Sequence, residues 1–201
     1  MEDNLIVCRE LSKRFGMKYA LDHVDLSIGR GRIVGLLGPN GSGKTTWIKL
    51  LCGLLQPSSG EARINGLLPG RETKAVISYL PDRMYFADWM VAGDLMDYFE
   101  DFYADFDRGR AERMCASLGI EKNHRIKTMS KGTKEKLQLA LVMSRRAQIY
   151  LLDEPIAGVD PAARDFILDT ILRNYKPRGT VIISTHLISH LEKVLEEGIF
   201  L

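Results

Sequence analysis

Gly38-Pro39-Asn40-Gly41-Ser42-Gly43-Lys44-Thr45 fits the pattern G-x-x-x-x-G-K-[ST], a glycine-rich loop that cradles phosphates. Glycines allow successive backbone N–H groups to turn inward around a polyphosphate. Lys44 carries a point charge toward the β- and γ-phosphates, and the hydroxyl of Thr45 is suited to hold Mg²⁺. The stretch therefore predicts that the chain binds a nucleotide.

The residues on either side of this loop favour the same interpretation over a chance glycine-rich turn. Residues 32–37 form a short apolar run that predicts a buried strand. Residues 46–55 follow with helical spacing, so the N-terminus of that helix is expected to face the anion. We therefore count Thr46 among the residues that contact the nucleotide.

Bulk composition limits the class of protein. The 201 residues are enough for one sizeable α/β domain. Lys and Arg number 28 against 26 Asp and Glu, a formal charge of +2, so there is no basic excess of the kind that binds duplexes and no nucleic-acid partner is expected. Three scattered cysteines indicate reduced thiols of a cytoplasmic protein, and no apolar run reaches the roughly 20 residues that span a bilayer.

The pattern along the chain predicts strands and helices that alternate around a helical segment. Apolar runs predict strands at residues 5–8, 24–28, 61–64, 76–80, 149–152 and 181–184. Helical spacing covers residues 92–147, within which a helix is expected over 134–147, and also residues 162–174 and 190–197. Continuous apolar strands between helices are typical of a parallel sheet that is covered on both faces.

Two carboxylates follow the apolar run at 149–152. Asp153 at the end of a buried strand is well placed to bind Mg²⁺ beside a phosphate loop. Glu154 is suited to accept a proton from an attacking water. The alternative is that Asp153 and Glu154 belong to an ordinary turn at the end of the strand. The phosphate loop elsewhere in the chain favours the metal-binding and catalytic interpretation.

The order of the remaining motifs resembles the ATP-binding-cassette (ABC) family, the ATPase subunits of ABC transporters. The stretches that carry the resemblance are Phe15, the signature-like Met129-Ser130-Lys131-Gly132-Thr133, the D-loop-like Ala157-Gly158-Val159-Asp160-Pro161 and Ser184-Thr185-His186. They lie in the family's order and, with the phosphate loop and Asp153-Glu154, extend over nearly the whole chain.

The resemblance implies a fold and a set of roles. It implies a RecA-like P-loop core with an N-terminal antiparallel β subdomain, formed by residues 1–91 and 148–201, and an inserted helical subdomain at 92–147. It implies that Phe15 stacks on adenine and that His186 orients the attacking water. Ser130 and Gly132 are expected to contact the ATP of a second subunit, although Ser130 also fits an ordinary helix N-cap.

The same resemblance implies cofactors, partners and location. ATP and Mg²⁺ are expected in a homodimer or heterodimer that drives a separate membrane-spanning subunit from the cytoplasmic face of the membrane. The sequences of several motifs resemble those of Gram-positive bacterial exporter-type ATPase subunits. The alternative is a soluble ABC ATPase without a transport role, in iron–sulfur assembly or as a regulatory scaffold.

Two features depart from the family pattern, and the chain ends early. Asp82 follows Tyr79-Leu80-Pro81 where the family has Gln, so Asp82 is expected to meet the metal or its water. Lys131 replaces the first signature glycine. The family continues past the strand expected near Gly198, so the chain is expected to be truncated at Leu201.

An aromatic stretch lies between residues 84 and 106, interleaved with acidic residues. We expect most of its apolar side chains to form the core of the helical segment. Those nearest Asp82 are expected to contribute to a groove for the membrane subunit.

Overall fold

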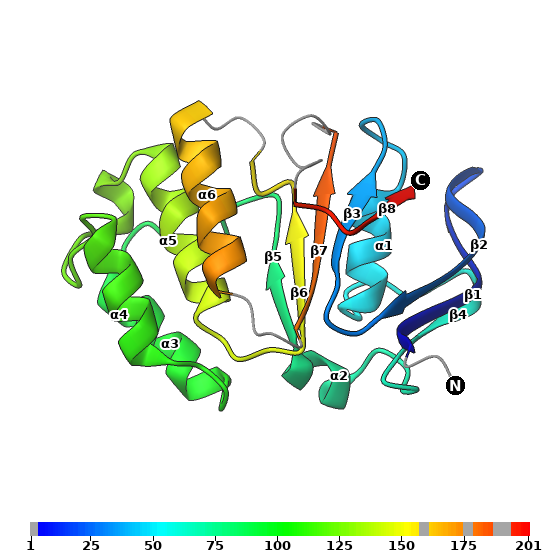
Figure 1. The fold of residues 1–201 in the computed structure, drawn as a ribbon, viewed down its shortest axis with the longest axis horizontal. Helices are drawn as coiled ribbons and strands as arrows, with labels where there is room; N and C mark the ends of the chain where they lie inside the picture. Colours follow the sequence, from blue (N-terminus) through cyan, green and yellow to red (C-terminus); the bar gives the residue numbers. More distant parts are fainter. Residues whose placement is uncertain (1–3, 157–160, 175–178, 187–193) are drawn as a thin grey trace.

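Two sheets and a group of helices make up the molecule (Figure 1). The structure is a computed structural model and describes residues 4–156, 161–174, 179–186 and 194–201. The antiparallel sheet has the strand order β2-β1-β4 and the parallel sheet the order β5-β6-β7-β3-β8. The helices α3, α4, α5 and α6 gather beyond β5, on the side away from the antiparallel sheet.

The antiparallel sheet is built from the N-terminal region. Its strands are β1 (Asn4–Phe15), β2 (Lys18–Gly29) and β4 (Ser59–Ile64). All three are longer than predicted, because their outer residues, most of them polar or glycine, pair with the neighbouring strand without forming an apolar run.

The parallel sheet carries the phosphate loop at its carboxyl edge. Its strands are β3 (Ile33–Leu37), β5 (Ile77–Leu80), β6 (Ile149–Asp153), β7 (Thr180–Thr185) and β8 (Glu197–Phe200). Every residue of β3, β6 and β7 is buried. All neighbouring pairs are parallel, which confirms the predicted α/β class and brings the ends of β3, β5, β6 and β7 to one edge.

The described helices differ from the predicted ones mainly at their ends. They are α1 (Lys44–Leu51), α2 (Arg71–Val76), α3 (Ala92–Phe102), α4 (Arg108–Ser117), the 3₁₀ turn η1 (Ile126–Thr128), α5 (Lys131–Met143) and α6 (Pro161–Asn174). The predicted helix at 46–55 stops at Leu51, because Gly53 at φ 63° forms a Schellman turn in which Leu54 N–H donates to Lys49 O across 2.9 Å.

Three further predictions of helices and strands need correction. Val76 is the last residue of α2, not the first of a strand, since the short helix α2 was not foreseen. The helix predicted at 134–147 runs from Lys131 to Met143, because Ser130 caps it three residues earlier. The helix predicted at 190–197 falls partly on residues 187–193, outside the described residues, and Glu197 begins β8 instead.

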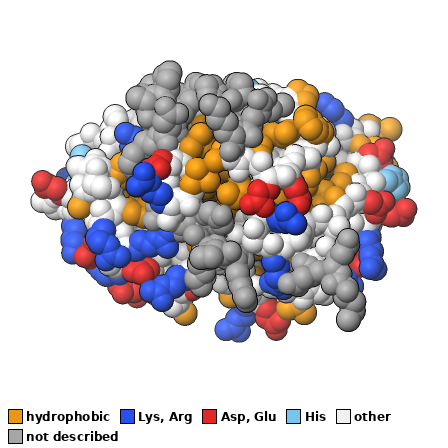
Figure 2. Space-filling model, in the orientation of Figure 1, with side chains coloured by type: hydrophobic (Ala, Val, Ile, Leu, Met, Phe, Trp, Pro, Cys, Tyr) orange, Lys and Arg blue, Asp and Glu red, His pale blue; other side chains and the backbone are white. Residues whose placement is uncertain are grey.

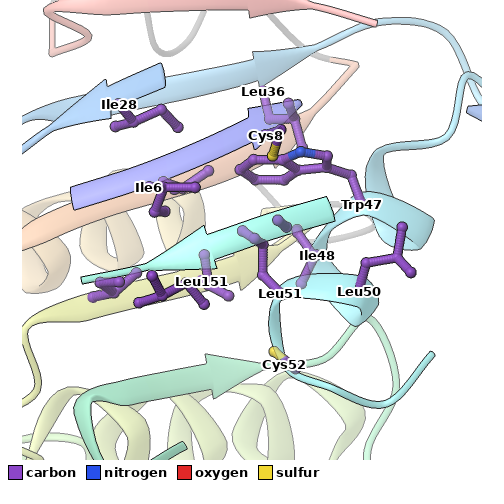
Figure 3. Packing of buried hydrophobic residues seen from close by; sticks show 14 of the residues in the cluster. Ile6, Cys8, Ile28, Leu36, Trp47, Ile48, Leu50, Leu51, Cys52 and Leu151 are labelled. Atoms are coloured by element: carbon purple, nitrogen blue, oxygen red, sulfur yellow. The ribbon is translucent and has the colours of Figure 1, made fainter. Parts of the chain in front are cut away.

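Trp47 fills the space between the two sheets. It is fully buried on α1 and packs in a cluster with Ile6, Cys8 and Leu36 (Figure 3). Because α1 contacts β2, β4 and β6, this cluster fixes the helix that follows the phosphate loop against both sheets. The opposite face of the parallel sheet packs against α5 and α6, with Tyr150 and Leu152 in its core.

The helices α3, α4 and α5 enclose a third apolar cluster, in which Phe99 is central. Most apolar side chains of residues 84–106 pack there, as predicted. Tyr85, Trp89, Tyr98 and Phe102 are exposed. On the face shown in Figure 2, hydrophobic side chains form a band across the upper middle and Lys and Arg side chains gather at the lower left.

Candidate functional site

The loop after β3 needs glycine at two positions for different reasons. Gly43 has φ 105°, and a Cβ there would lie 2.3 Å from the carbonyl oxygen of Ala20 on β2. Gly38 has φ 149°, and its Cβ would lie 2.6 Å from Ser42 Oγ. At Gly43 the antiparallel sheet lies against the loop, and at Gly38 the loop folds back on its own Ser42. Only glycine permits these two close approaches.

Lys44 is held inside the loop. Its ammonium donates hydrogen bonds to Gly38 O at 2.8 Å and Pro39 O at 3.0 Å, and it lies 3.7 Å from Glu154 Oε1. The side chain is only 5% exposed. The loop thus keeps a buried positive charge next to a carboxylate, at the place where a phosphate would meet the loop amides.

Asp153 is the centre of a buried hydrogen-bond network. Its Oδ1 accepts from Thr45 Oγ1 at 3.1 Å and from Ser184 Oγ at 2.6 Å. The backbone N–H of Glu154 in turn donates to Ser184 Oγ at 2.9 Å. Burial raises the pKa of Asp153 above its usual range, and the hydrogen bonds from Ser184 and Thr45 oppose that rise.

His186 faces Glu154 from the end of β7. Its Nδ1 lies 3.2 Å and 3.1 Å from the two carboxylate oxygens of Glu154. Glu154 has φ 50°, in the left-handed region that costs energy for a residue with a side chain. A strained backbone at Glu154 lowers the stability of the fold, so its retention indicates that the position of the Glu154 side chain has a function.

The predicted residues line two hollows. The first, of about 260 Å³, is lined by Ala20, Asn40, Gly41, Gly43, Lys44, Thr45, Thr46, Asp82 and Glu154. The second, of about 600 Å³, extends from Asp153, Glu154 and His186 toward Lys131 and Lys134 of α5. The structure therefore brings the phosphate loop, both strand-end carboxylates, His186 and Asp82 together.

Asp82 also borders a groove on the outside. This groove, of about 610 Å³, is lined by residues that include Lys49, Tyr79, Met84, Tyr85 and Tyr103. Asp82 lines all three hollows, so the loop after β5 lies between the phosphate loop and the outer groove.

The residues present fit a magnesium ion. Asp153 is only 1% exposed, and within the described residues its Oδ2 has no hydrogen-bond partner. A buried carboxylate oxygen without a partner is costly unless a cation or its water meets it. Thr45 supplies a hydroxyl beside it, and no cage of three or more His, Cys, Asp or Glu side chains occurs among the described residues. Phosphate and water oxygens would therefore complete the coordination.

Three predicted contacts lie apart from these hollows. Phe15 is 52% exposed at the end of β1, with Lys13 Nζ 5.2 Å from its ring centroid. Ser130 caps α5, where its Oγ accepts from the N–H of Thr133 at 3.1 Å. Gly132 lies in ordinary helix with open space beside it, so the fold does not itself require glycine there.

Ser184 was not foreseen as a site residue, although its hydroxyl joins Asp153 to Glu154. The sequence feature that could have identified Ser184 is a polar residue at the end of an apolar strand. In the structure Ser184 pairs with Asp153 on the neighbouring strand. Sequence alone does not pair the two strands. The D-loop-like residues 157–160 lie outside the described residues.

Comparison with known proteins decides the family. Residues 21–157 match the family described as ABC transporter, and they make up more than half of the chain. The chain belongs to the ABC transporter family. Within the ABC family the predicted P-loop core with its antiparallel sheet and helices is confirmed by the observed sheets and by similar solved structures.

Individual ABC relatives support the assignment of this chain to the family. An uncharacterised ABC transporter ATP-binding protein of Synechocystis sp. is 28% identical over 98% of this chain and 60% of its own length. YtrB, an ABC transporter ATP-binding protein of Bacillus subtilis, is 31% identical over 94% of this chain and 66% of its own. A solved structure described as the ATP-binding subunit of an ABC transporter has a TM-score of 0.85 at 25% identity, over 98% of this chain and 85% of that one. The chain thus spans about two thirds or less of the length of these two curated relatives.

No described helix is both long enough and apolar enough to cross a membrane.

Proposed function

We propose that this ABC chain hydrolyses ATP to ADP and phosphate and powers transport through a separate membrane-spanning subunit. The observation that carries the proposal is the network in which Thr45 and Ser184 bind Asp153 while Lys44 faces Glu154. It combines a phosphate loop, a metal-binding carboxylate and a base in one place.

The phosphate loop would bind the triphosphate. The backbone N–H groups of residues 40–46 and the Lys44 ammonium would surround the β- and γ-phosphates. Lys44 already lies at the loop carbonyls of Gly38 and Pro39, so it would exchange those partners for phosphate oxygens. The exposed ring of Phe15 would stack on adenine.

Thr45 and Asp153 would hold Mg²⁺, with Asp82 facing it or its water. When bound, the ion neutralises charge on the phosphates as the bond to the leaving group breaks. Glu154 would accept the proton of the attacking water, and His186, 3.1 Å from that carboxylate, would orient the water toward the γ-phosphate.

A second ABC subunit would complete the site. Ser130 and the first amides of α5 would meet the γ-phosphate bound to the partner subunit, since α5 has no acidic residue in its first turn. Open space beside Gly132 leaves room for that approach. ATP would then contact both halves only in the closed dimer, so binding would favour closure.

The outer groove beside Asp82 is the place we propose for the membrane-spanning subunit. Exposed aromatic rings such as Tyr85 next to the half-buried Tyr79 fit a protein interface. Docking there would hold the chain at the cytoplasmic face of the membrane. We further propose that residues 92–147 form a helical unit inserted into a core of 1–91 and 148–201, because α3, α4 and one face of α5 enclose a core of their own.

Phosphate release and size-exclusion chromatography with Mg²⁺ and ATP test this function. Wild-type chain should release phosphate continuously, whereas Glu154→Gln should bind ATP, release phosphate at least about 10²-fold more slowly and elute as a dimer. Near-normal turnover in Glu154→Gln would overturn the role of Glu154. Wild-type chain that binds ATP without turnover would overturn the proposed reaction.

A further inference from the structure

Arg145 is a buried arginine far from the phosphate loop. It follows the end of α5, and its side chain is only 2% exposed. Its Nε donates to Asp105 Oδ1 at 2.9 Å, and its two terminal nitrogens donate to the backbone carbonyls of Ala75 and Ile77. The centre of the guanidinium lies 3.9 Å from the ring centroid of Tyr103.

These partners come from two separate parts of the chain. Asp105 and Tyr103 belong to the connection between α3 and α4, whereas Ala75 and Ile77 lie at the junction of α2 and β5. One planar guanidinium therefore fastens the helical region to the start of β5. An ammonium group could not reproduce this, because it lacks the flat fork of donors.

A second buried contact reinforces the attachment. Ser78 Oγ donates to Val142 O on α5 across 2.8 Å. Two of the four residues of β5, Ile77 and Ser78, are thus held by the end of α5 and the residue group around Arg145. Burying a charged arginine is costly, so its three hydrogen bonds and its ring contact indicate that the position of β5 is tightly specified.

β5 leads straight to the phosphate site. After its last residue, Leu80, come Pro81 and Asp82, and Asp82 lines the hollow around the phosphate loop. Ile77 and Tyr103, which both contact Arg145, also line the outer groove with Asp82. Arg145 therefore lies behind the groove wall, at the other end of the strand that positions Asp82.

We propose that Arg145 is a positioning residue for Asp82. It fixes β5 against the connection between α3 and α4, and through β5 it sets where the Asp82 carboxylate stands in the phosphate site. The inference rests on the proposed function, since it assumes that Asp82 influences ATP turnover. A purely structural Arg145 would affect stability and leave the turnover of folded molecules unchanged.

A double-mutant cycle with Arg145→Lys and Asp82→Asn tests the proposal. Arg145→Lys should lower kcat by about 3- to 30-fold with KM for ATP within about twofold, the size of coupling found between interacting positions. In the Asp82→Asn background the same change should lower kcat by less than about twofold. Arg146→Lys is the matched control, because the neighbouring Arg146 is 61% exposed and pairs with Asp107 at the surface, and it should leave kcat unchanged.

Several results would overturn the proposal. Equal fold-changes from Arg145→Lys in both backgrounds would show that Arg145 acts independently of Asp82. Normal turnover in Asp82→Asn would show that Asp82 does not influence turnover, and it too would overturn the proposal. If Arg145→Lys does not fold, Asp105→Asn replaces it in the cycle, with the same expected non-additivity. Absence of turnover in the wild-type chain would remove the proposed function and this inference together, whereas wild-type turnover with an additive cycle removes the inference alone.

Discussion

His186 lies across the carboxylate of Glu154, with Nδ1 at 3.2 Å and 3.1 Å from the two oxygens. The two residues follow β6 and β7, which are neighbours in the parallel sheet. Ser184 holds the Glu154 backbone from the same strand that carries His186. The geometry of the proposed base and its neighbour is therefore set by a single pair of strands.

Replacing His186 tests this pairing. His186→Ala should reduce steady-state phosphate release by about 10²-fold while the affinity for ATP changes by less than about threefold, because the loop amides and Lys44 still bind the phosphates. His124→Ala, on the loop before η1, is the control and should turn over normally. Loss of ATP affinity in His186→Ala, measured by calorimetry, would mean that His186 binds the nucleotide and does not orient water.

Asp82 stands where the family pattern has Gln, and it lines the hollow around the phosphate loop. Asp82→Asn removes a charged oxygen near the proposed Mg²⁺, so we expect kcat to fall at least about threefold with little change in the dissociation constant for ATP. Asp101→Asn on the exposed face of α3 is the matched control. Equal turnover of Asp82→Asn and wild type in a steady-state assay would exclude Asp82 from the mechanism.

The ionised carboxylate of Asp153 should lower the free energy of unfolding of the metal-free protein at neutral pH. Burial raises the pKa of Asp153, so the folded state binds its proton more readily than the unfolded state, and ionisation above that pKa costs stability. Without Mg²⁺, Asp153→Asn should therefore raise the free energy of unfolding at pH 7 by about 1 kcal/mol, or Tm by about 2–4 °C. The difference should shrink as the pH falls through the raised pKa of Asp153.

Added Mg²⁺ and ATP should reverse that order. The ligands should raise the Tm of wild type clearly more than that of Asp153→Asn, because the variant keeps the phosphate loop and lacks the carboxylate that would hold Mg²⁺. Thermal unfolding with and without Mg²⁺ and ATP measures both parts. A lower metal-free Tm for Asp153→Asn at pH 7 would show that the ionised carboxylate is satisfied by something other than a cation.

The phosphate loop and the order of the motifs could be predicted because they depend on local sequence. Residues 38–45 specify their own turn, and apolar runs such as 149–152 fix buried strands. Contacts between distant segments could not be predicted. Arg145 is a charged residue in an arginine pair, and nothing local indicates that Asp105 and the carbonyls of Ala75 and Ile77 surround it.

The ends of helices were also predicted inaccurately, since they depend on single residues. Gly53 ends α1 earlier than the apolar spacing implies, and Ser130 begins α5 earlier. The exposure of Tyr98 and Phe102 was equally open, because helical spacing places aromatic residues on a face without saying what covers it.

The three cysteines should be inert in the folded chain. Burial raises the pKa of Cys8 to about 11, of Cys52 to about 12 and of Cys115 to about 11. At pH 8 the thiolate fraction is then on the order of one in a thousand or less, so a thiol reagent should label none of them within minutes and all of them in denaturant. Rapid labelling of Cys52 alone at pH 8 would show that the outer groove opens in solution.

Calorimetric titration of the purified chain with ATP in the presence of Mg²⁺ tests the central claim most directly. We expect saturable binding with one nucleotide per chain and a dissociation constant between about 1 μM and 1 mM. Lys44→Ala, checked for folding by circular dichroism, should bind at least about tenfold more weakly, because it loses the buried charge at the loop. A folded wild-type chain that binds no ATP at millimolar concentration, or binds it equally well without Lys44, would contradict the account.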